Sequence, residues 1–361
     1  MCVAHTCVWR AAEAGNVPAP NGLGFRVPLL LISPWTRGNI AYSELTDHTS
    51  VIQFLEKRFG IHCSNISPWR RAMTGDLTAA FDFDAPDYTW PDLPDTSEYV
   101  DESQVECDTL PDIMVPAEQI MPVQEEGVRV SRALDYRFVV SGGVGDGKLG
   151  FRIENVGKWG APFALFDVTN NEVVDPKQYA VEGGKFVEHE IELVGADYSY
   201  FLFGPNGFVR SWSGSGVTTG GTVSLEYDEE GDCVVFVASE GAGAVAVVDN
   251  AYGREEVELK GGETVRVNVA GSSNWYDYSV GGQRFMGRME NGRDGTSDPA
   301  MAEGKPGLWQ ETAVGGGRVL GEHPLVEERL RTLKRTDKPS SGGGHKDEAF
   351  VWDGGGRESE L

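Results

Sequence analysis

The sequence predicts a mixed fold, in which a short α/β segment is followed by two small all-β sandwich domains. Two observations predict it. Residues 27–32 form a nearly continuous apolar run, typical of a strand that is buried on both faces of a parallel sheet, and a helical pattern follows the run. From residue 134 onward the pattern changes to short alternating segments separated by Gly-rich turns, which is typical of a β-sandwich, and it occurs twice.

The predicted strand at residues 27–32 lacks the neighbours that a parallel sheet needs. The residues before it offer at most one further short strand. Parallel strands are joined by crossovers whose helices cover the faces of the sheet, so a complete α/β domain needs several of these units. We therefore expect residues 1–83 to be a partial α/β domain, whose beginning is missing from the chain.

A helix is predicted soon after this strand. Thr46 and Asp47 are residue types that cap helix N-termini, apolar residues follow at helical spacing, and Gly60 is the stop signal. Asp47 and His48 therefore lie at a helix N-terminus beyond the end of a strand, where active sites of α/β proteins commonly lie and where phosphate oxygens are favoured. They are the candidate catalytic residues. The alternative is that Asp47 only caps the helix, and that His48 packs or hydrogen-bonds locally.

Residues 84–129 are predicted to be an acidic, Pro-rich linker or surface crossover. The stretch from 82 to 126 contains fourteen Asp or Glu, six Pro and no Lys or Arg, so it cannot bury a core of its own. Isolated aromatic residues between 81 and 90 favour a crossover anchored to the surface. The alternative is that this acidic and aromatic strip binds an organic cation such as choline through cation–π contacts.

The remaining chain is predicted to be β-rich. Short strands at sandwich spacing are expected at residues 136–140, 148–153, 163–168, 187–193 and 198–203. Residues 198–208 then recur as residues 275–285, with an offset of 77 or 78 along the repeat. This predicts two related β-sandwich domains, at residues 130–216 and 217–302. The Gly-rich tail at residues 303–361 is predicted to be disordered.

Several short motifs carry a family resemblance. Ser-Pro-Trp at residues 33–35, Asp-His-Thr-Ser at 47–50 and Asn-Ile-Ser-Pro-Trp-Arg-Arg at 65–71 precede Gly-Asp-Leu-Thr at 75–78. In this order they resemble the C-terminal end of the catalytic domain in the phosphoesterase family that includes the non-haemolytic, phosphatidylcholine-type phospholipases C. The hallmark segments of the two sandwich repeats resemble the small C-terminal domain, usually in tandem, of the same phospholipases C.

The resemblance implies an alkaline-phosphatase-like α/β fold for the first segment, and hydrolysis of phospholipids of the phosphatidylcholine class as the function. Trp35 and Arg37 are the candidate substrate-binding residues. In the family, the Ser or Thr nucleophile and the acidic metal ligands lie mostly upstream of the strand at 27–32, so we expect them, and a divalent metal, only in a full-length member. The alternative function is a non-catalytic remnant, whose tandem sandwiches serve as a binding or scaffold module.

The amino-acid composition limits the classes of molecule that this chain can bind. The formal net charge of -25 at pH 7 disfavours nucleic acid, because nucleic-acid binding depends on clustered Lys and Arg, whereas a zwitterionic phospholipid headgroup is compatible. No apolar run is long enough to span a membrane, and residues 1–20 lack a secretory hydrophobic region, although the family is usually secreted. Cys2, His5 and Cys7 are too few ligands for a zinc site, so no cofactor is evident.

Overall fold

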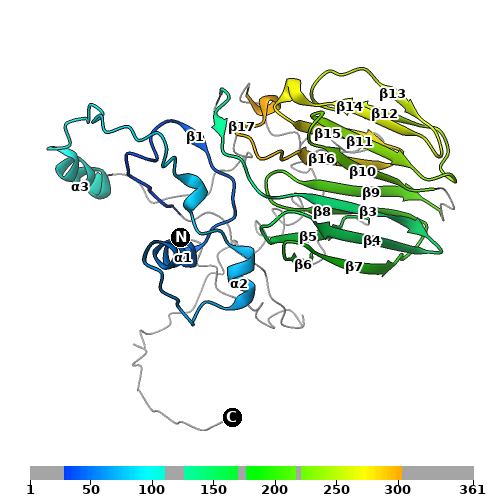
Figure 1. Cartoon of the computed structure of the whole chain (residues 1–361), viewed down its shortest axis with the longest axis horizontal. Helices are drawn as coiled ribbons and strands as arrows, with labels where there is room; N and C mark the ends of the chain where they lie inside the picture. Colours follow the sequence, from blue (N-terminus) through cyan, green and yellow to red (C-terminus); the bar gives the residue numbers. More distant parts are fainter. Residues whose placement is uncertain (1–27, 110–125, 170–175, 217–220, 303–361) are drawn as a thin grey trace, which may run out of the picture.

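The computed structural model describes residues 28–109, 126–169, 176–216 and 221–302. A layered β-structure forms the larger part, and a smaller helical part precedes it in the chain (Figure 1). The β-rich character predicted for the second part of the chain is confirmed. The predicted tail at residues 303–361 lies outside the described residues. None of the described helices is long and apolar enough to cross a membrane.

The first sequence repeat forms two facing sheets. One contains β3 (Phe138–Gly145), β4 (Lys148–Asn155) and β7 (Lys185–Glu192), in the order β3-β4-β7. The other contains β6 (Lys177–Val181), β5 (Ala161–Asp167), β8 (Asp197–Phe203) and β9 (Val209–Ser215), in the order β6-β5-β8-β9. Alternate side chains of β4 and β5, among them Leu149, Ile153 and Phe163, are buried between the sheets. The strands predicted from the alternating pattern are therefore confirmed.

The second repeat has the same arrangement. One sheet contains β10 (Val223–Asp228), β11 (Cys233–Ala238) and β14 (Thr264–Asn268). Its facing strands are β13 (Val257–Leu259), β12 (Val245–Asp249), β15 (Trp275–Val280) and β16 (Gln283–Arg288). Leu225, Phe236, Tyr278 and Phe285 lie in its core. Each strand thus has a counterpart in the first repeat, as the recurring sequence predicted.

The two repeats share one continuous sheet. β9 pairs antiparallel with β16, which gives the eight-stranded order β13-β12-β15-β16-β9-β8-β5-β6 (Figure 1). In this pairing Val209 lies opposite Met286, and Trp212 lies opposite Gln283. Because β9 and β16 are equivalent strands of the two repeats and pair antiparallel, the repeats are related by an approximate twofold axis between them. The tandem repeats are fused through backbone hydrogen bonds.

The N-terminal segment contains α1 (His48–Phe59), α2 (Pro68–Met73) and a short 3-10 helix at Thr78–Ala80. Helix α1 confirms its predicted signals, since Asp47 is the N-cap and Gly60 ends the helix in a left-handed conformation with φ of 66°. The prediction of a strand at residues 27–32 is wrong for residues 28–32, the part of this run that the structure describes, because they form no strand. Ile32 in this run is 90% exposed. A parallel strand forms only beside a partner, and no described strand pairs with this segment.

The N-terminal segment is attached to the β-structure by a small sheet and by packing. β2 (Val130–Ser131) pairs parallel with β1 (Ile40–Ala41) and antiparallel with β17 (Gly295–Thr296). The guanidinium of Arg132, next to β2, forms ion pairs with the carboxylates of Asp82 and Asp294, with N–O distances of 3.5 Å and 3.0 Å. A Cβ atom on Gly160 would collide with the carbonyl oxygen of Ala72, which shows how closely α2 approaches β5. Three distant parts of the chain therefore meet at β2.

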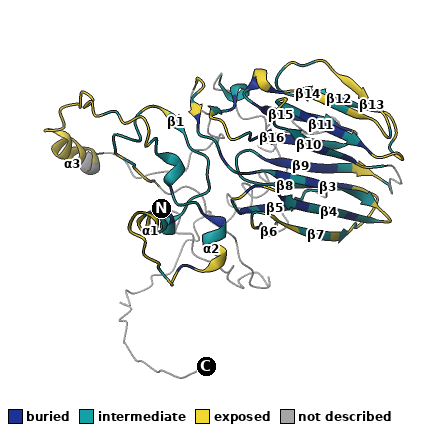
Figure 2. Ribbon diagram, viewed as in Figure 1, coloured by how far each residue is buried: buried dark blue, intermediate teal, exposed yellow. Residues whose placement is uncertain are grey.

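The acidic stretch follows the surface only in its first part. Phe81 stacks between Phe54 and Phe83, with ring centroids 5.1 Å and 5.4 Å apart. Phe81 and Phe83 therefore anchor the crossover, as predicted. Tyr88 and Trp90 do not anchor it, since they are 68% and 87% exposed. The chain then forms α3 (Tyr99–Thr109), a helix that the sequence did not predict and that projects away from the β-structure (Figure 2).

Candidate functional site

Asp47 is built into the junction between α1 and α2. Its Oδ1 atom accepts hydrogen bonds from the Thr49 amide at 2.7 Å and from Thr49 Oγ1 at 2.6 Å, and its backbone N–H donates to Ser50 Oγ at 3.0 Å. Its Oδ2 atom pairs with the guanidinium of Arg70. The Asp47 side chain is only 3% exposed. One carboxylate oxygen thus caps α1, and the other joins the start of α1 to α2.

His48 is the first residue of α1, and its imidazole is incompletely satisfied. The Nε2 atom is buried and has no hydrogen-bond partner in the described part of the chain. Buried polar side-chain atoms nearly always have a partner, so a buried ring nitrogen without one is unusual. His48 therefore retains one hydrogen-bonding position that this structure does not use.

Trp35 and Arg37 lie with the start of the acidic crossover. The Arg37 guanidinium donates to the carbonyl oxygen of Thr89 and lies 3.6 Å from Asp87, while the Trp35 ring is 6.0 Å from the ring of Phe83. Among the described residues, no hydrogen bond or ion pair joins either side chain to Asp47 or His48. The sequence candidates thus form two separate pairs.

The described side chains do not fit a divalent metal site by themselves. Across residues 28–109, 126–169, 176–216 and 221–302, no group of three or more His, Cys, Asp or Glu side chains could hold a metal ion. We therefore assign no catalytic step through a metal to these residues.

A polar cavity of about 470 Å³ lies between the two N-terminal helices and the first sandwich. Glu44, Asp76 and Lys57 line it, with Lys57 Nζ 2.8 Å from Asp76 Oδ2. Burial raises the pKa of Glu44 to about 7, although a hydrogen bond from the hydroxyl of Tyr42 opposes the shift. Glu44 is therefore a carboxyl group that is partly protonated near neutral pH in the folded protein.

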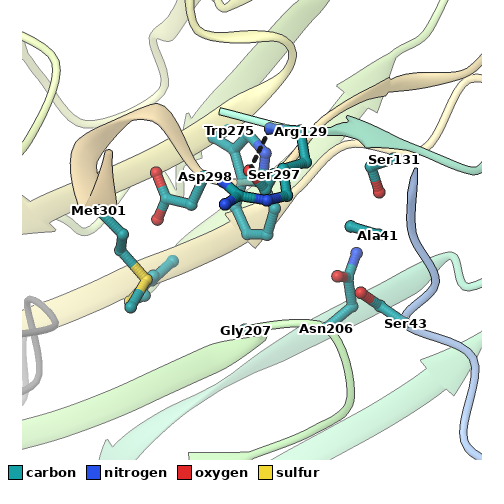
Figure 3. Close-up of a pocket in the computed structure, with 11 residues that line it drawn as sticks. Ala41, Ser43, Arg129, Ser131, Asn206, Gly207, Trp275, Ser297, Asp298 and Met301 are labelled. Atoms are coloured by element: carbon teal, nitrogen blue, oxygen red, sulfur yellow. Dashed lines mark hydrogen bonds between the residues drawn. The ribbon is translucent and has the colours of Figure 1, made fainter. Parts of the chain in front are cut away.

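A larger cavity of about 610 Å³, here called the junction cavity, lies where the N-terminal segment, β2, both repeats and the segment after β17 meet (Figure 3). Its lining includes Ser43, Ser131, Asn206, Trp275, Asp298 and Met301. The last four of these lie in or just after the hallmark segments of the two repeats, but the sequence did not predict that they share a cavity. They lie up to 95 residues apart along the chain, so only the fold brings them together.

A tight turn positions the first repeat at this cavity. Asn206 and Gly207 connect β8 and β9 with positive φ values of 54° and 71°, a conformation that Asn and Gly tolerate in tight turns. The Asn206 amide donates to Glu290 Oε1 at 3.1 Å, and a Cβ atom on Gly207 would lie 3.2 Å from the Trp275 ring. Glycine therefore allows the turn to approach the second repeat closely.

Two arginines of the hallmark segments lie inside the protein, although arginine side chains are mostly exposed. Arg210 is 2% exposed, and Arg288 is 7% exposed. Arg288 donates to Glu290 Oε1 at 2.6 Å, and Glu290 Oε2 accepts the Leu134 amide at 3.2 Å. Burial raises the pKa of Glu290, and the charge of Arg288 opposes this shift. Glu290 thus links Arg288 to the first repeat.

Comparisons with known proteins agree with the sequence blocks. Residues 6–62 match the phosphoesterase family, and residues 130–215 match the bacterial phospholipase C, C-terminal domain. The chain is 38% identical over 319 residues to a non-hemolytic phospholipase C of Burkholderia pseudomallei, and 40% identical over 313 residues to a protein of the same name from Pseudomonas aeruginosa. These alignments cover 81% and 79% of this chain, and 45% of each relative. The chain thus spans about half the length of the curated relatives it matches.

Proposed function

Because this chain belongs to the phosphoesterase-family phospholipases C, as its sequence blocks predicted, we propose that it forms the C-terminal part of an enzyme that hydrolyses the phosphodiester bond of phospholipids of the phosphatidylcholine class. The observation that carries the proposal is that matches to a phosphoesterase domain and to a phospholipase C C-terminal domain occur in one chain. Relatives named phospholipase C align with both segments.

The N-terminal segment is, in this proposal, the end of an α/β phosphoesterase domain. It exposes several apolar side chains that a finished domain would cover. Leu30 and Ile32, within the apolar run at 27–32, are 84% and 90% exposed. On α1, Val51, Leu55 and Phe59 are 43%, 42% and 64% exposed. Exposed apolar surface of this extent marks an interaction site. We call Leu30, Ile32, Val51, Leu55 and Phe59 the apolar face.

The site residues take roles from this arrangement. His48 lies at the N-terminus of the helix that carries the apolar face, and its unused Nε2 atom is available to a group of the completed domain. Asp47 fixes the helix start through Thr49 and Arg70. Trp35 and Arg37 keep their proposed role as substrate-binding residues at the edge of that domain. A Ser or Thr nucleophile and the metal ligands would come from the rest of the phosphoesterase domain.

The domain division completes the proposal. We assign residues 1–83 to the partial phosphoesterase domain, 84–129 to the crossover, and 130–216 and 217–302 to the two sandwich domains. β1 and α2 contact the β-structure directly, so the sandwiches would hold the end of the phosphoesterase domain in place.

A complementation assay tests the proposed function. The chain is assayed for release of phosphocholine from phosphatidylcholine, alone and after mixing with the part of the Burkholderia pseudomallei relative that this chain does not match. We expect no turnover by the chain alone and metal-dependent turnover by the mixture. Leu55→Asp on the apolar face should abolish the gain, whereas Val194→Asp, at an apolar residue 84% exposed on the first sandwich, should not.

The opposite pattern would contradict the proposal. Metal-dependent turnover by the chain alone that is lost in Asp47→Ala would place a complete site within these residues. A mixture that forms a complex through the apolar face but does not hydrolyse the lipid would favour the alternative function, a binding or scaffold module. The junction cavity is the observation that supports this second candidate, because residues of both repeats line it and no residue of the apolar face does.

A further inference from the structure

A long exposed segment of the crossover carries negative charge only. Every residue from 88 to 106 is exposed, and the segment ends within α3, which projects away from the β-structure (Figure 2). We call residues 88–106 the acidic arm. It has no Lys or Arg, and its six carboxylates belong to Asp92, Asp95, Glu98, Asp101, Glu102 and Glu106. No described lysine or arginine forms an ion pair with any of these six, so the described structure leaves the charge of the arm uncompensated.

Three of these carboxylates lie along one face of α3. Glu98, Glu102 and Glu106 recur every four residues, and the Glu102 amide donates to the Glu98 carbonyl oxygen at 3.0 Å, as in a helical turn. Like charges at this spacing repel one another and destabilise a helix. A row of cations bound along this face would remove the repulsion.

Large apolar side chains are interspersed with the carboxylates. Trp90 is 87% exposed, Leu93 is 72% exposed, and at the start of α3 Tyr99 and Val100 are 50% and 79% exposed. A lysine or arginine side chain can place its charged end at a carboxylate and its aliphatic stem, or its cation, on an aromatic ring. The acidic arm is therefore suited to a basic polypeptide that also carries apolar residues.

The chain itself contains such a polypeptide. Residues 329–338, here called the basic segment, include five Lys or Arg, one Asp, and the apolar Leu330 and Leu333. The whole chain has only 31 Lys or Arg among 361 residues and a net charge of -25, so this run is an exception to the charge of the chain. Charge complementarity therefore favours the basic segment as the occupant of the arm, because the rest of a second copy would be repelled.

The described structure ends beside the crossover, which brings the basic segment within reach of the acidic arm. The carbonyl oxygen of Ala302, the last described residue, accepts a hydrogen bond from the Gly127 amide at 2.7 Å. Residues 303–328 connect Ala302 to the basic segment, and a chain of that length spans at most about 90 Å. This exceeds the diameter of about 50 Å expected for a compact domain of about 300 residues.

We propose that the basic segment, residues 329–338, docks on the acidic arm of the same chain. Its Lys and Arg side chains pair with the carboxylates of α3, and its leucines contact the exposed apolar side chains of the arm. Single ion pairs on a surface are weak, but the connection through residues 303–328 raises the effective concentration of the segment at the arm. The docking uses neither His48 nor the apolar face, so it is independent of the function proposed above.

Anisotropy of a fluorescently labelled peptide of residues 325–340 measures this docking. The acceptor is the full chain with its own basic segment neutralised by Arg329→Gln, Arg331→Gln, Lys334→Gln and Arg335→Gln. We expect saturable binding to this acceptor, with a Kd that rises with salt concentration. Binding to the unaltered chain should be at least about tenfold weaker, because its own segment occupies the arm.

Two matched triple variants of the acceptor locate the site. Glu98→Gln, Glu102→Gln and Glu106→Gln together remove three charges from one face of α3, and should raise the Kd of the peptide about tenfold. The control removes three carboxylates from exposed positions of the second repeat, by Glu240→Gln, Glu255→Gln and Glu256→Gln, and should leave the Kd unchanged. All six positions are exposed, so thermal unfolding should show that both variants fold.

Carbodiimide cross-linking of an equal mixture of unlabelled and nitrogen-15-labelled full chain identifies the occupant. We expect amide links from Lys334 or Lys338 to carboxylates of the acidic arm, each within a single chain. Links between labelled and unlabelled chains would show that the tail of a second copy occupies the arm, and would overturn the proposal. Absence of saturable peptide binding to the acceptor would also overturn it, as would equal Kd values for the two triple variants.

Discussion

Arg210 joins the two repeats through a buried charge. Its guanidinium donates to the Met286 carbonyl oxygen at 3.0 Å and to the Tyr276 hydroxyl at 3.0 Å, and it lies 4.2 Å from the centroid of the Phe208 ring. Tyr227 completes the cluster with a hydrogen bond to Tyr276 at 2.7 Å. The strand β9 that carries Arg210 belongs to the first repeat, and both tyrosines belong to the second. This side chain therefore fastens the shared sheet from within.

Replacing Arg210 should destabilise the protein strongly. Arg210→Ala leaves a cavity and removes donors from buried oxygens, so we expect a loss of about 3–5 kcal/mol in the free energy of unfolding, measured in urea. Arg293→Ala is the control, because the Arg293 side chain is 63% exposed and its ion pair with Asp232 should contribute at most about 1 kcal/mol. Similar losses for both variants would show that Arg210 does not fasten the repeats.

Glu44 should make stability depend on pH. The pKa of this carboxyl group is raised from 4.5 to about 7 in the folded protein, mainly by burial. A carboxyl group with a raised pKa binds its proton more tightly in the folded state, so its contribution is fully present below pH 4.5 and is lost as the pH rises through about 7. After allowance for partial solvation, the loss should be about 1–2 kcal/mol.

The measurement compares urea unfolding at pH 5 and pH 8. The unaltered protein should lose more stability over this interval than Glu44→Gln, whose amide does not titrate. Glu226→Gln at an exposed position of β10 should behave like the unaltered protein. A Glu44→Gln variant with the same pH dependence as the unaltered protein would mean that Glu44 is ionised at both pH values in the folded state.

At the scale of single elements, the sequence predicted α1 well and the preceding strand poorly. Helix hydrogen bonds close within the segment, and the signals at Asp47 and Gly60 mark both of its ends. A strand needs a partner, and the apolar pattern of residues 27–32 does not specify one. Burial of Arg210 was also not predictable, because Met286, Tyr227 and Tyr276, which accept hydrogen bonds from its guanidinium, lie on strands of the other repeat.

Hydrogen exchange should separate these elements. Amides of residues 28–32 have no strand partner in the described structure, so they should exchange rapidly, whereas amides of β8 and β15 lie inside the shared sheet and should exchange slowly. The exchange rates are measured by mass spectrometry on peptides from the intact chain. Equal protection of residues 28–32 and of the two strands would mean that the apolar run has found a stable partner.

For the whole molecule, the sequence predicted the β-rich repeats but not their fusion. The recurrence of residues 198–208 as 275–285 identifies equivalent strands, and alternation identifies their buried faces. Neither pattern states that β9 pairs with β16, because edge strands of two repeats look alike whether they stay free or join. The junction cavity escaped prediction for the same reason, since its lining comes from segments that meet only through this pairing and through β2.

Activity of a chimera tests the central claim most directly. In the chimera, this chain replaces the matching 45% of the Burkholderia pseudomallei phospholipase C, and hydrolysis of phosphatidylcholine is measured. We expect turnover by the chimera, loss of turnover in its Leu55→Asp variant because the apolar face no longer packs, and retention in Val194→Asp. A chimera that folds and unfolds cooperatively, yet hydrolyses no phosphatidylcholine, would contradict the conclusion that this chain serves as the C-terminal part of such an enzyme.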